Sequence, residues 1–141
     1  MRNLLAFDLG ASNGRAILGQ FDGEKITMRE LHRFENNYIE MNGVFYWDLP
    51  YLYNQLKQGL LAFRNANVGK LDCIGIDTWG VDYGLLDKNG QLLSNPRSYR
   101  YALDEDMAEA WKTVDFPTLF ARTGIATMNF NTVYQLYRRK R

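Results

Sequence analysis

The residues best suited to chemistry in this sequence lie in one short stretch, DLGASNGR at positions 8–15. Asp8 ends an apolar run, and glycines alternate with small polar residues before the next apolar run begins. Glycine lets a backbone pass close to a ligand, while serine and asparagine side chains add hydrogen-bonding groups. Such a turn can aim several backbone N–H groups at one point, which suits phosphate oxygens. Asp8 beside it could hold Mg²⁺, because this ion takes oxygen ligands and keeps several waters.

This stretch is not one of the two common nucleotide-binding fingerprints, since it matches neither GxxxxGK[ST] nor GxGxxG. The residues therefore leave two interpretations open. In one, the turn binds phosphate and Arg15 pairs with a transferred phosphoryl group. In the other, the turn is an ordinary hairpin that Asp8 and Arg15 only cap.

The elements that position this turn follow from the spacing of apolar residues. Short apolar runs without a helical period predict buried strands at 3–8 and 72–77, and strand-like runs occupy 15–21 and 25–34. The Asp-Gly pair at 22–23 favours a hairpin, so we expect the first three strands to form an antiparallel meander.

A change of period predicts a helix over residues 49–66, which Asp48 caps and in which Pro50 occupies the first turn. Its apolar face is expected to hold Leu49, Leu52, Leu56, Leu60 and Phe63. The strand after it, at 72–77, should lie parallel to one of the first three strands, because such crossovers are right-handed.

The remaining sequence predicts a hairpin around Asn89 and Gly90 and then a series of helices. These helices are expected over 103–114, over 115–123 with Gly124 closing the end, and over 132–141. The fold class is therefore α/β, a mixed sheet with flanking helices. This order of elements resembles the ribonuclease-H-like unit of the actin, hexokinase and heat-shock-chaperone type, which sugar kinases share.

Composition limits the possible functions. A net charge of +1 over 141 residues gives no field to attract nucleic acid or an anionic membrane, and no segment has the length of a membrane span. Cys73 has no partner for an internal disulfide and is expected to be a buried small apolar residue, which favours a cytoplasmic setting. The single histidine, His32, lies in an expected strand and is assigned a structural role.

FDLGASNGR resembles the first phosphate motif of the FGGY carbohydrate kinases. IGIDTWGVDYGLLD, with Trp47-Asp48 before it and MNFNTVYQL after it, resembles more specifically the branch that uses ATP to phosphorylate L-rhamnulose at its primary hydroxyl. The resemblance covers essentially the whole chain, and GIDTWGVD is a far more specific motif than the phosphate turn. Residues implied to contact the ATP phosphates are Ala11, Ser12, Asn13, Gly14 and Arg15, with Asp8 near Mg²⁺.

The resemblance also implies that Gly80 touches the ketose. The turn around Gly80 suits a sugar wall, because Trp79 offers an apolar face and Asp77 or Asp82 could accept hydroxyl protons. The same residues allow a plainer interpretation, in which Trp79 is a core aromatic and Asp77 caps a strand. Asn131 could close the pocket or cap the following helix.

Arg100 aligns with a basic residue near the sugar in this family. The family commonly continues with an aspartate and an arginine where this chain has Tyr101 and Leu103. This departure leaves related ketoses such as L-fuculose or xylulose open as substrates.

In the family resembled, the catalytic base is an aspartate of a later GD motif, and adenine is held by a second domain. We therefore expect residues 1–141 to be the N-terminal kinase domain in incomplete form, with the C-terminal domain absent. The piece is expected to be inactive as a kinase and able to self-associate through apolar surface that it leaves uncovered. The alternative from another class is a non-catalytic sugar-binding module.

Overall fold

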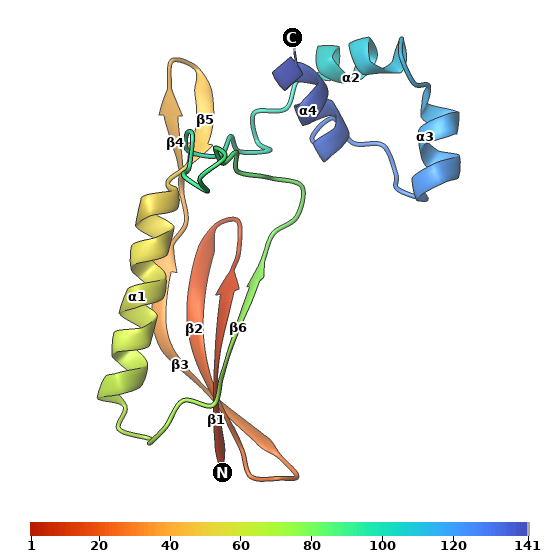
Figure 1. Ribbon diagram of the computed structural model, residues 1–141. Helices are drawn as coiled ribbons and strands as arrows, with labels where there is room; N and C mark the ends of the chain where they lie inside the picture. The colour runs from red at the N-terminus through yellow and green to blue at the C-terminus, as the bar shows by residue number, and fades with distance from the viewer. Residues whose placement is uncertain (141) are drawn as a thin grey trace. The chain divides into compact units, whose positions relative to one another are not determined.

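The computed structural model describes residues 1–140, and the chain divides into two compact units. The first unit consists of Met1–Tyr38 and Asp48–Gly80 (Figure 1). The second consists of Ile39–Trp47 and the chain from Val81 onward. Each unit is described by itself below.

The first unit is built on a four-stranded sheet with the strand order β3-β2-β1-β6. The strands are β1 (Arg2–Leu9), β2 (Asn13–Phe21), β3 (Ile26–Glu35) and β6 (Cys73–Thr78). β2 pairs antiparallel with both β1 and β3, whereas β6 pairs parallel with β1. The predicted meander and the predicted parallel strand are both confirmed. A bulge shifts the β2–β3 register between Ala16 and Ile17.

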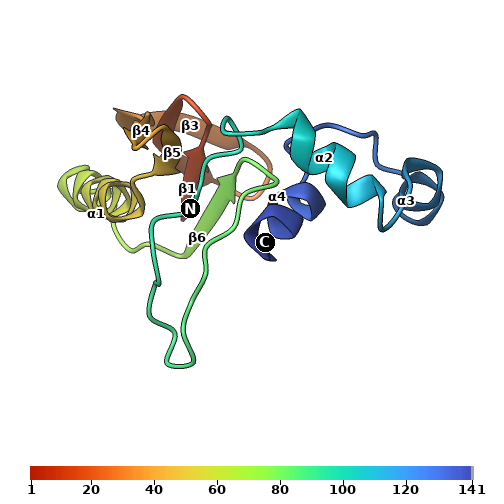
Figure 2. The same cartoon turned by 90° about the horizontal axis from the view of Figure 1, so that it is seen from above.

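Helix α1 (Leu49–Asn65) covers one face of this sheet, where it packs on β1, β2 and β3 (Figure 2). Its amino end is capped as predicted, because the Asp48 carboxylate accepts a hydrogen bond of 3.0 Å from the Tyr51 amide. The buried core between helix and sheet comprises Leu5, Phe7, Ala16, Leu18 and Phe63.

The predicted apolar face of α1 is only partly right. Leu52 and Phe63 are buried, but Leu49 and Leu60 are each 38% exposed. Gly59 occupies the buried position instead, at the point where the helix lies closest to the sheet. A Cβ atom on Gly59 would lie 2.4 Å from Cε1 of Phe7, so a larger residue would not fit there. Because Gly59 faces the sheet, the next residue of the helix, Leu60, faces away from it.

Two predictions about burial in β6 are wrong. Every residue of this strand is exposed, and Cys73 is an exposed free thiol. The physical reason is that β6 forms the edge of the sheet while α1 packs over the other three strands. Ile74 and Ile76 are 47% and 59% exposed, and the expected self-association, which stays a prediction, would cover them.

The second unit contains a short hairpin that the sequence analysis did not predict. Strands β4 (Tyr38–Met41) and β5 (Val44–Trp47) pair with each other, joined by Asn42 and Gly43 with φ values of 51° and 73°. Positive φ at both central residues is typical of a type I′ turn. At Asn89 and Gly90 the turn forms, but it carries only an isolated bridge between Leu86 and Leu92 instead of regular strands.

Three helices complete the second unit, close to their predicted positions: α2 (Asp104–Trp111), α3 (Phe116–Thr123) and α4 (Thr132–Lys140). Gly124 closes α3 with a φ of 66°, as predicted. Arg141, the last residue of the predicted final helix, lies outside the described residues. Across residues 1–140, the helices are too short or too polar for any of them to cross a membrane.

Candidate functional site

The turn between β1 and β2 is held in a fixed shape by its own backbone and by Asn36. The Gly10 amide donates to the Asn13 carbonyl at 2.9 Å, while the Asn36 amide donates to the Ser12 carbonyl at 3.0 Å. The Asn36 side chain donates to the Gly10 carbonyl at 2.7 Å. Asn36 is only 2% exposed, so these bonds are shielded from water. No local sequence pattern points to Asn36, because it lies far along the chain from the turn it holds.

This anchoring leaves two neighbouring amides available to a ligand. Within residues 1–140, the Ala11 and Ser12 N–H groups donate to no acceptor of the protein. Asn13, Gly14 and Arg15 already belong to β2, where they pair with residues of β3. Of the five residues predicted to contact phosphate, the first two lie on the turn and have unpaired amides, and the other three begin β2. Adjacent unpaired N–H groups in a turn make a concavity suited to anions.

Glycine is needed in this stretch for space and not for unusual backbone angles. Neither Gly10 nor Gly14 has a positive φ. A Cβ on Gly14 would lie 2.2 Å from Cζ of Phe34, and one on Gly10 would lie 2.8 Å from the Asn13 carbonyl oxygen. Both glycines therefore permit close packing around the turn.

A row of charged residues crosses the sheet beside the turn. The strand register places Arg33 opposite Arg15, Arg15 opposite Asp8, and Asp8 opposite Asp77. Residues paired in this way project from the same face of a sheet. Asp8 and Asp77 thus come together near the carboxyl ends of two parallel strands.

The two carboxylates fit a magnesium ion that is shared with a ligand. Mg²⁺ is usually held by one or two carboxylates together with waters and substrate phosphates. Among residues 1–140, no group of three or more acidic, histidine or cysteine side chains could hold a metal alone. Asp8 also pairs with Arg15 at 3.1 Å, yet its side chain remains 43% exposed.

Two arginines occupy the opposite end of the row, each paired with a carboxylate. Arg33 binds both carboxylate oxygens of Glu30, at 2.6 and 3.0 Å, and this lowers the pKa of Glu30 and raises that of Arg33. Arg33 also reaches the Asn13 side chain at 3.3 Å. The Arg15 Nε is buried and has no acceptor among the described residues, while its Nη2 pairs with Asp8.

The second unit contains a strained residue within the GIDTWGVD motif. Val81 has a φ of 69°, which is rare for a β-branched residue and costs conformational energy. Its carbonyl accepts hydrogen bonds from the Thr132 hydroxyl at 2.6 Å and the Gln135 side chain at 3.3 Å. No sequence pattern predicts a positive φ at a valine, and the sequence analysis missed it.

The residues predicted to bind sugar are divided between the units. Asp77, Trp79 and Gly80 belong to the first unit, and the other predicted residues belong to the second. In the second unit, Asp82 accepts a 2.5 Å hydrogen bond from the indole of Trp47, a side chain that is only 1% exposed in total. The other Asp82 oxygen accepts a hydrogen bond from the Gln135 side chain at 3.3 Å, so both oxygens have partners within the second unit.

Arg100 and Asn131 also have contacts within the second unit. The Arg100 guanidinium lies 5.6 Å from the centre of the Tyr99 ring. The Asn131 side chain donates to the Ala126 carbonyl at 3.0 Å and lines a cavity of ≈ 270 Å³ with mostly apolar walls. In the first unit, His32 bonds to the Gln55 side chain at 2.7 Å, in agreement with its predicted structural role.

Proteins of known function align with nearly the whole chain, although no family model matches it. The rhamnulokinase of Mannheimia succiniciproducens is 42% identical over 137 residues, which are 95% of this chain and 28% of that protein. The rhamnulokinase of Bacteroides thetaiotaomicron is 42% identical over 96% of this chain and 28% of its own length. That of Halalkalibacterium halodurans is 43% identical over 100% of this chain and 30% of its own length. The chain thus spans about three-tenths of these relatives.

Solved structures of sugar kinases share the fold. A ligand-bound xylulose kinase from Lactobacillus acidophilus matches 100% of this chain and 29% of its own, with a TM-score of 0.79 and 14% identity. A gluconate kinase from the same organism matches 99% of this chain and 28% of its own, with a TM-score of 0.79 and 15% identity. The predicted ribonuclease-H-like fold class is confirmed, and the fold is incomplete relative to these kinases.

The sequence identity is more specific than the shared fold, because it points to one kind of sugar kinase. It extends along 95–100% of this chain in each of the rhamnulokinases compared. Over nearly its whole length the chain is therefore similar to an N-terminal part of the rhamnulokinases, and these matches support such a sugar kinase as its source.

Proposed function

We propose that this chain supplies the phosphate-binding turn and part of the sugar site of an ATP-dependent kinase that converts L-rhamnulose to L-rhamnulose 1-phosphate. The observation that carries the proposal is the turn at Ala11 and Ser12, whose amides have no acceptor in residues 1–140 and whose shape Asn36 fixes. The relatives' names support the substrate. A single unpaired cysteine, Cys73, is consistent with a cytoplasmic enzyme.

Phosphoryl transfer depends mainly on positioning and electrostatic stabilisation. The Ala11 and Ser12 amides would bind phosphate oxygens, and Arg15 would donate its unpartnered Nε–H to another. Asp8, with Asp77 beside it, would hold Mg²⁺, which neutralises phosphate charge when bound. Trp79 and Gly80 would contact the sugar.

The proposal predicts a specific response to nucleotide. In a titration with ATP and Mg²⁺ followed by amide NMR, the Ala11 and Ser12 resonances shift saturably. Asn36→Ala removes the side-chain bond to the Gly10 carbonyl that holds the turn, so binding weakens by roughly fivefold or more. Asn54→Ala, an exposed asparagine of α1, is the matched control and leaves binding unchanged. Absence of a shift at Ala11 and Ser12 would contradict the proposal, as would equal weakening by both variants.

We also propose that these residues do not complete the catalytic site, because the family resemblance places the proton-accepting base elsewhere. In a coupled assay with L-rhamnulose, ATP and Mg²⁺, the 141-residue chain is expected to show no turnover above background. A rate of about 1–100 s⁻¹, which is ordinary for a kinase, would overturn this statement.

One observation keeps related ketoses open as substrates. Tyr101, which stands where the family commonly has an aspartate, packs its ring against Phe45 and beneath Arg138. Leu103 precedes α2 and is 37% exposed. Neither side chain supplies the charge of the family's residues, so L-fuculose or xylulose are the alternative substrates. The alternative is a non-catalytic sugar-binding module. Such a module would bind sugar, but nucleotide would not shift its Ala11 and Ser12 amide resonances.

A further inference from the structure

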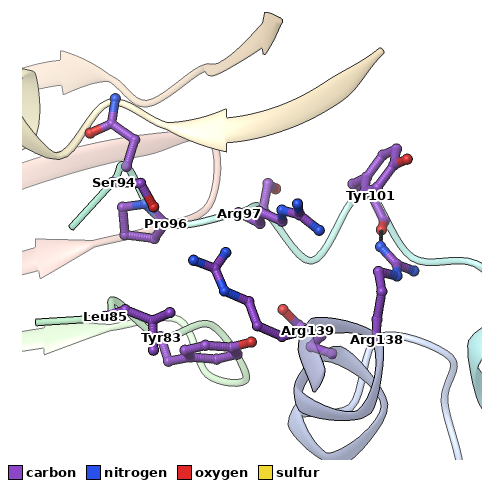
Figure 3. Close-up of a pocket in the computed structure, with 11 residues that line it drawn as sticks. Tyr83, Leu85, Ser94, Pro96, Arg97, Tyr101, Arg138 and Arg139 are labelled. Atoms are coloured by element: carbon purple, nitrogen blue, oxygen red, sulfur yellow. Dashed lines mark hydrogen bonds between the residues drawn. The ribbon is translucent and has the colours of Figure 1, made fainter. Parts of the chain in front are cut away.

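The second unit contains a positively charged site of its own. A cavity of ≈ 20 Å³ lies between the segment at residues 94–98 and the end of α4, and Arg97, Arg138 and Arg139 line it. In Figure 3, Arg139 extends from α4 toward the segment that carries Pro96 and Arg97. The residues that line the cavity include no aspartate or glutamate.

The arginines differ in how far their charge is neutralised. Arg138 is fully engaged, since it pairs with the carboxylate of Asp106 and donates to the Tyr101 carbonyl at 2.7 Å (Figure 3). Arg97 and Arg139 make no ion pair with any residue in the range 1–140. Two cationic side chains therefore border one cavity without an ion-pair partner among residues 1–140.

Arg97 has, in addition, an unused donor. Its Nε is buried and has no acceptor in the described part of the chain. A buried N–H group without a partner is unfavourable, and such groups are commonly satisfied by a bound ion or water. The same cavity thus combines uncompensated positive charge with an unsatisfied hydrogen-bond donor.

The size of the cavity restricts the ligand. One water needs about 10–15 Å³, so a space of ≈ 20 Å³ excludes a sugar ring or a nucleotide base. Because the cavity is partly open to solvent, an anion could place one oxygen inside it and keep the rest of its atoms at the mouth. Guanidinium groups bind phosphate and carboxylate through paired, charge-assisted hydrogen bonds. Tyr83, Ser94 and Ser98 supply further polar groups around the cavity.

We propose that Arg97 and Arg139 form a binding site for a small oxyanion of the phosphate class, either inorganic phosphate or the phosphoryl group of a phosphorylated metabolite. The site shares no residue with the phosphate-binding turn or the predicted sugar site. The outcome of its test is therefore independent of the proposed kinase function.

The test is a titration of the chain with inorganic phosphate at low ionic strength, followed through the arginine Nε–H resonances by NMR. The Arg97 Nε–H signal is expected to shift saturably with millimolar affinity. Arg97→Gln and Arg139→Gln each weaken binding by roughly fivefold or more, because each removes a charge-assisted contact. Arg122→Gln, which removes the same charge from α3 outside the cavity, changes affinity less than about twofold.

Parallel titrations identify the source of the anion. Ribose 5-phosphate that binds more tightly than inorganic phosphate indicates a phosphorylated metabolite, and the reverse order indicates the free ion. Circular dichroism checks that each variant folds. If Arg97→Gln does not fold, the exposed Arg139→Gln decides the outcome by itself. The proposal is overturned if phosphate produces no saturable shift, or if Arg122→Gln weakens binding as much as Arg139→Gln.

Discussion

Arg138→Met is expected to lower the free energy of unfolding of the second unit by about 3–5 kcal/mol. Arg138 binds the Asp106 carboxylate through its Nε and Nη2 atoms, and the Asp106 side chain is only 9% exposed. Without the guanidinium, a buried carboxylate loses its counter-charge, which costs far more than a surface pair would. The Tyr101 carbonyl also loses its donor. Urea denaturation measures the loss, and hydrogen exchange at α2 and α4 locates it.

Two further variants separate this effect from a general loss of charge. Lys112→Met breaks the pair with Glu109 in the same unit, but Lys112 is 69% exposed, so the expected loss is below about 1 kcal/mol. Adding Asp106→Leu to Arg138→Met should recover much of the stability, because no unpaired charge then remains buried. Equal losses for Arg138→Met and Lys112→Met would show that the buried pair is not important.

Gly59→Ala is expected to destabilise the first unit by about 1–3 kcal/mol, although alanine is the better helix former by about 1 kcal/mol. The added Cβ would lie 2.4 Å from Cε1 of Phe7 and 2.8 Å from Cβ of Ala16. Phe7 is 2% exposed and Ala16 is 0% exposed, so neither has room to move aside. Overpacking should therefore outweigh the gain in helix propensity. Thermal unfolding followed by circular dichroism measures the change.

The matched control for Gly59→Ala is Gln58→Ala, at an exposed position one residue earlier in α1. It introduces the same residue without the contact and should leave stability within about 0.5 kcal/mol of the parent. Gly75→Ala offers a second comparison, because no atom lies within 4 Å of the added carbon. A stabilised Gly59→Ala variant would mean that α1 can move away from the sheet at little cost.

Local signals in the sequence predicted most elements of the fold. The Asp48 cap, the Asp-Gly turn and the apolar period were sufficient for α1 and for the meander, because each acts over a few residues. The Asn42-Gly43 pair carried an equally good hairpin signal, which was overlooked. Burial of β6 was predicted wrongly, since an apolar run shows that a strand can be covered but not what covers it. The 3.6-residue period likewise could not show that Gly59, and not Leu60, faces the sheet where α1 lies closest to it.

The candidate site was predictable only where its residues are adjacent in sequence. Ala11, Ser12 and Asp8 were identified from their types and spacing, whereas the register that sets Asp77 beside Asp8 is a property of the assembled sheet. Asn36 could not be predicted, because its bonds to Gly10 and Ser12 span some two dozen residues. Val81 has a positive φ, and the partners of its carbonyl, Thr132 and Gln135, also lie far away in the chain.

The bulge in β3 determines which way Arg33 points. Ala16 pairs with His32 and Ile17 with Glu30, so Leu31 is the additional residue on β3. In a regular strand, residues three apart project from opposite faces, and Glu30 could not reach Arg33. With Leu31 inserted, both project from the same face, and Glu30 holds the guanidinium through two bonds close to Asn13. Deleting Leu31 would leave Glu30 and Arg33 two residues apart in a regular strand, where both still project from one face, so the bulge is what lets β3 carry an additional residue without separating this pair beside the first turn.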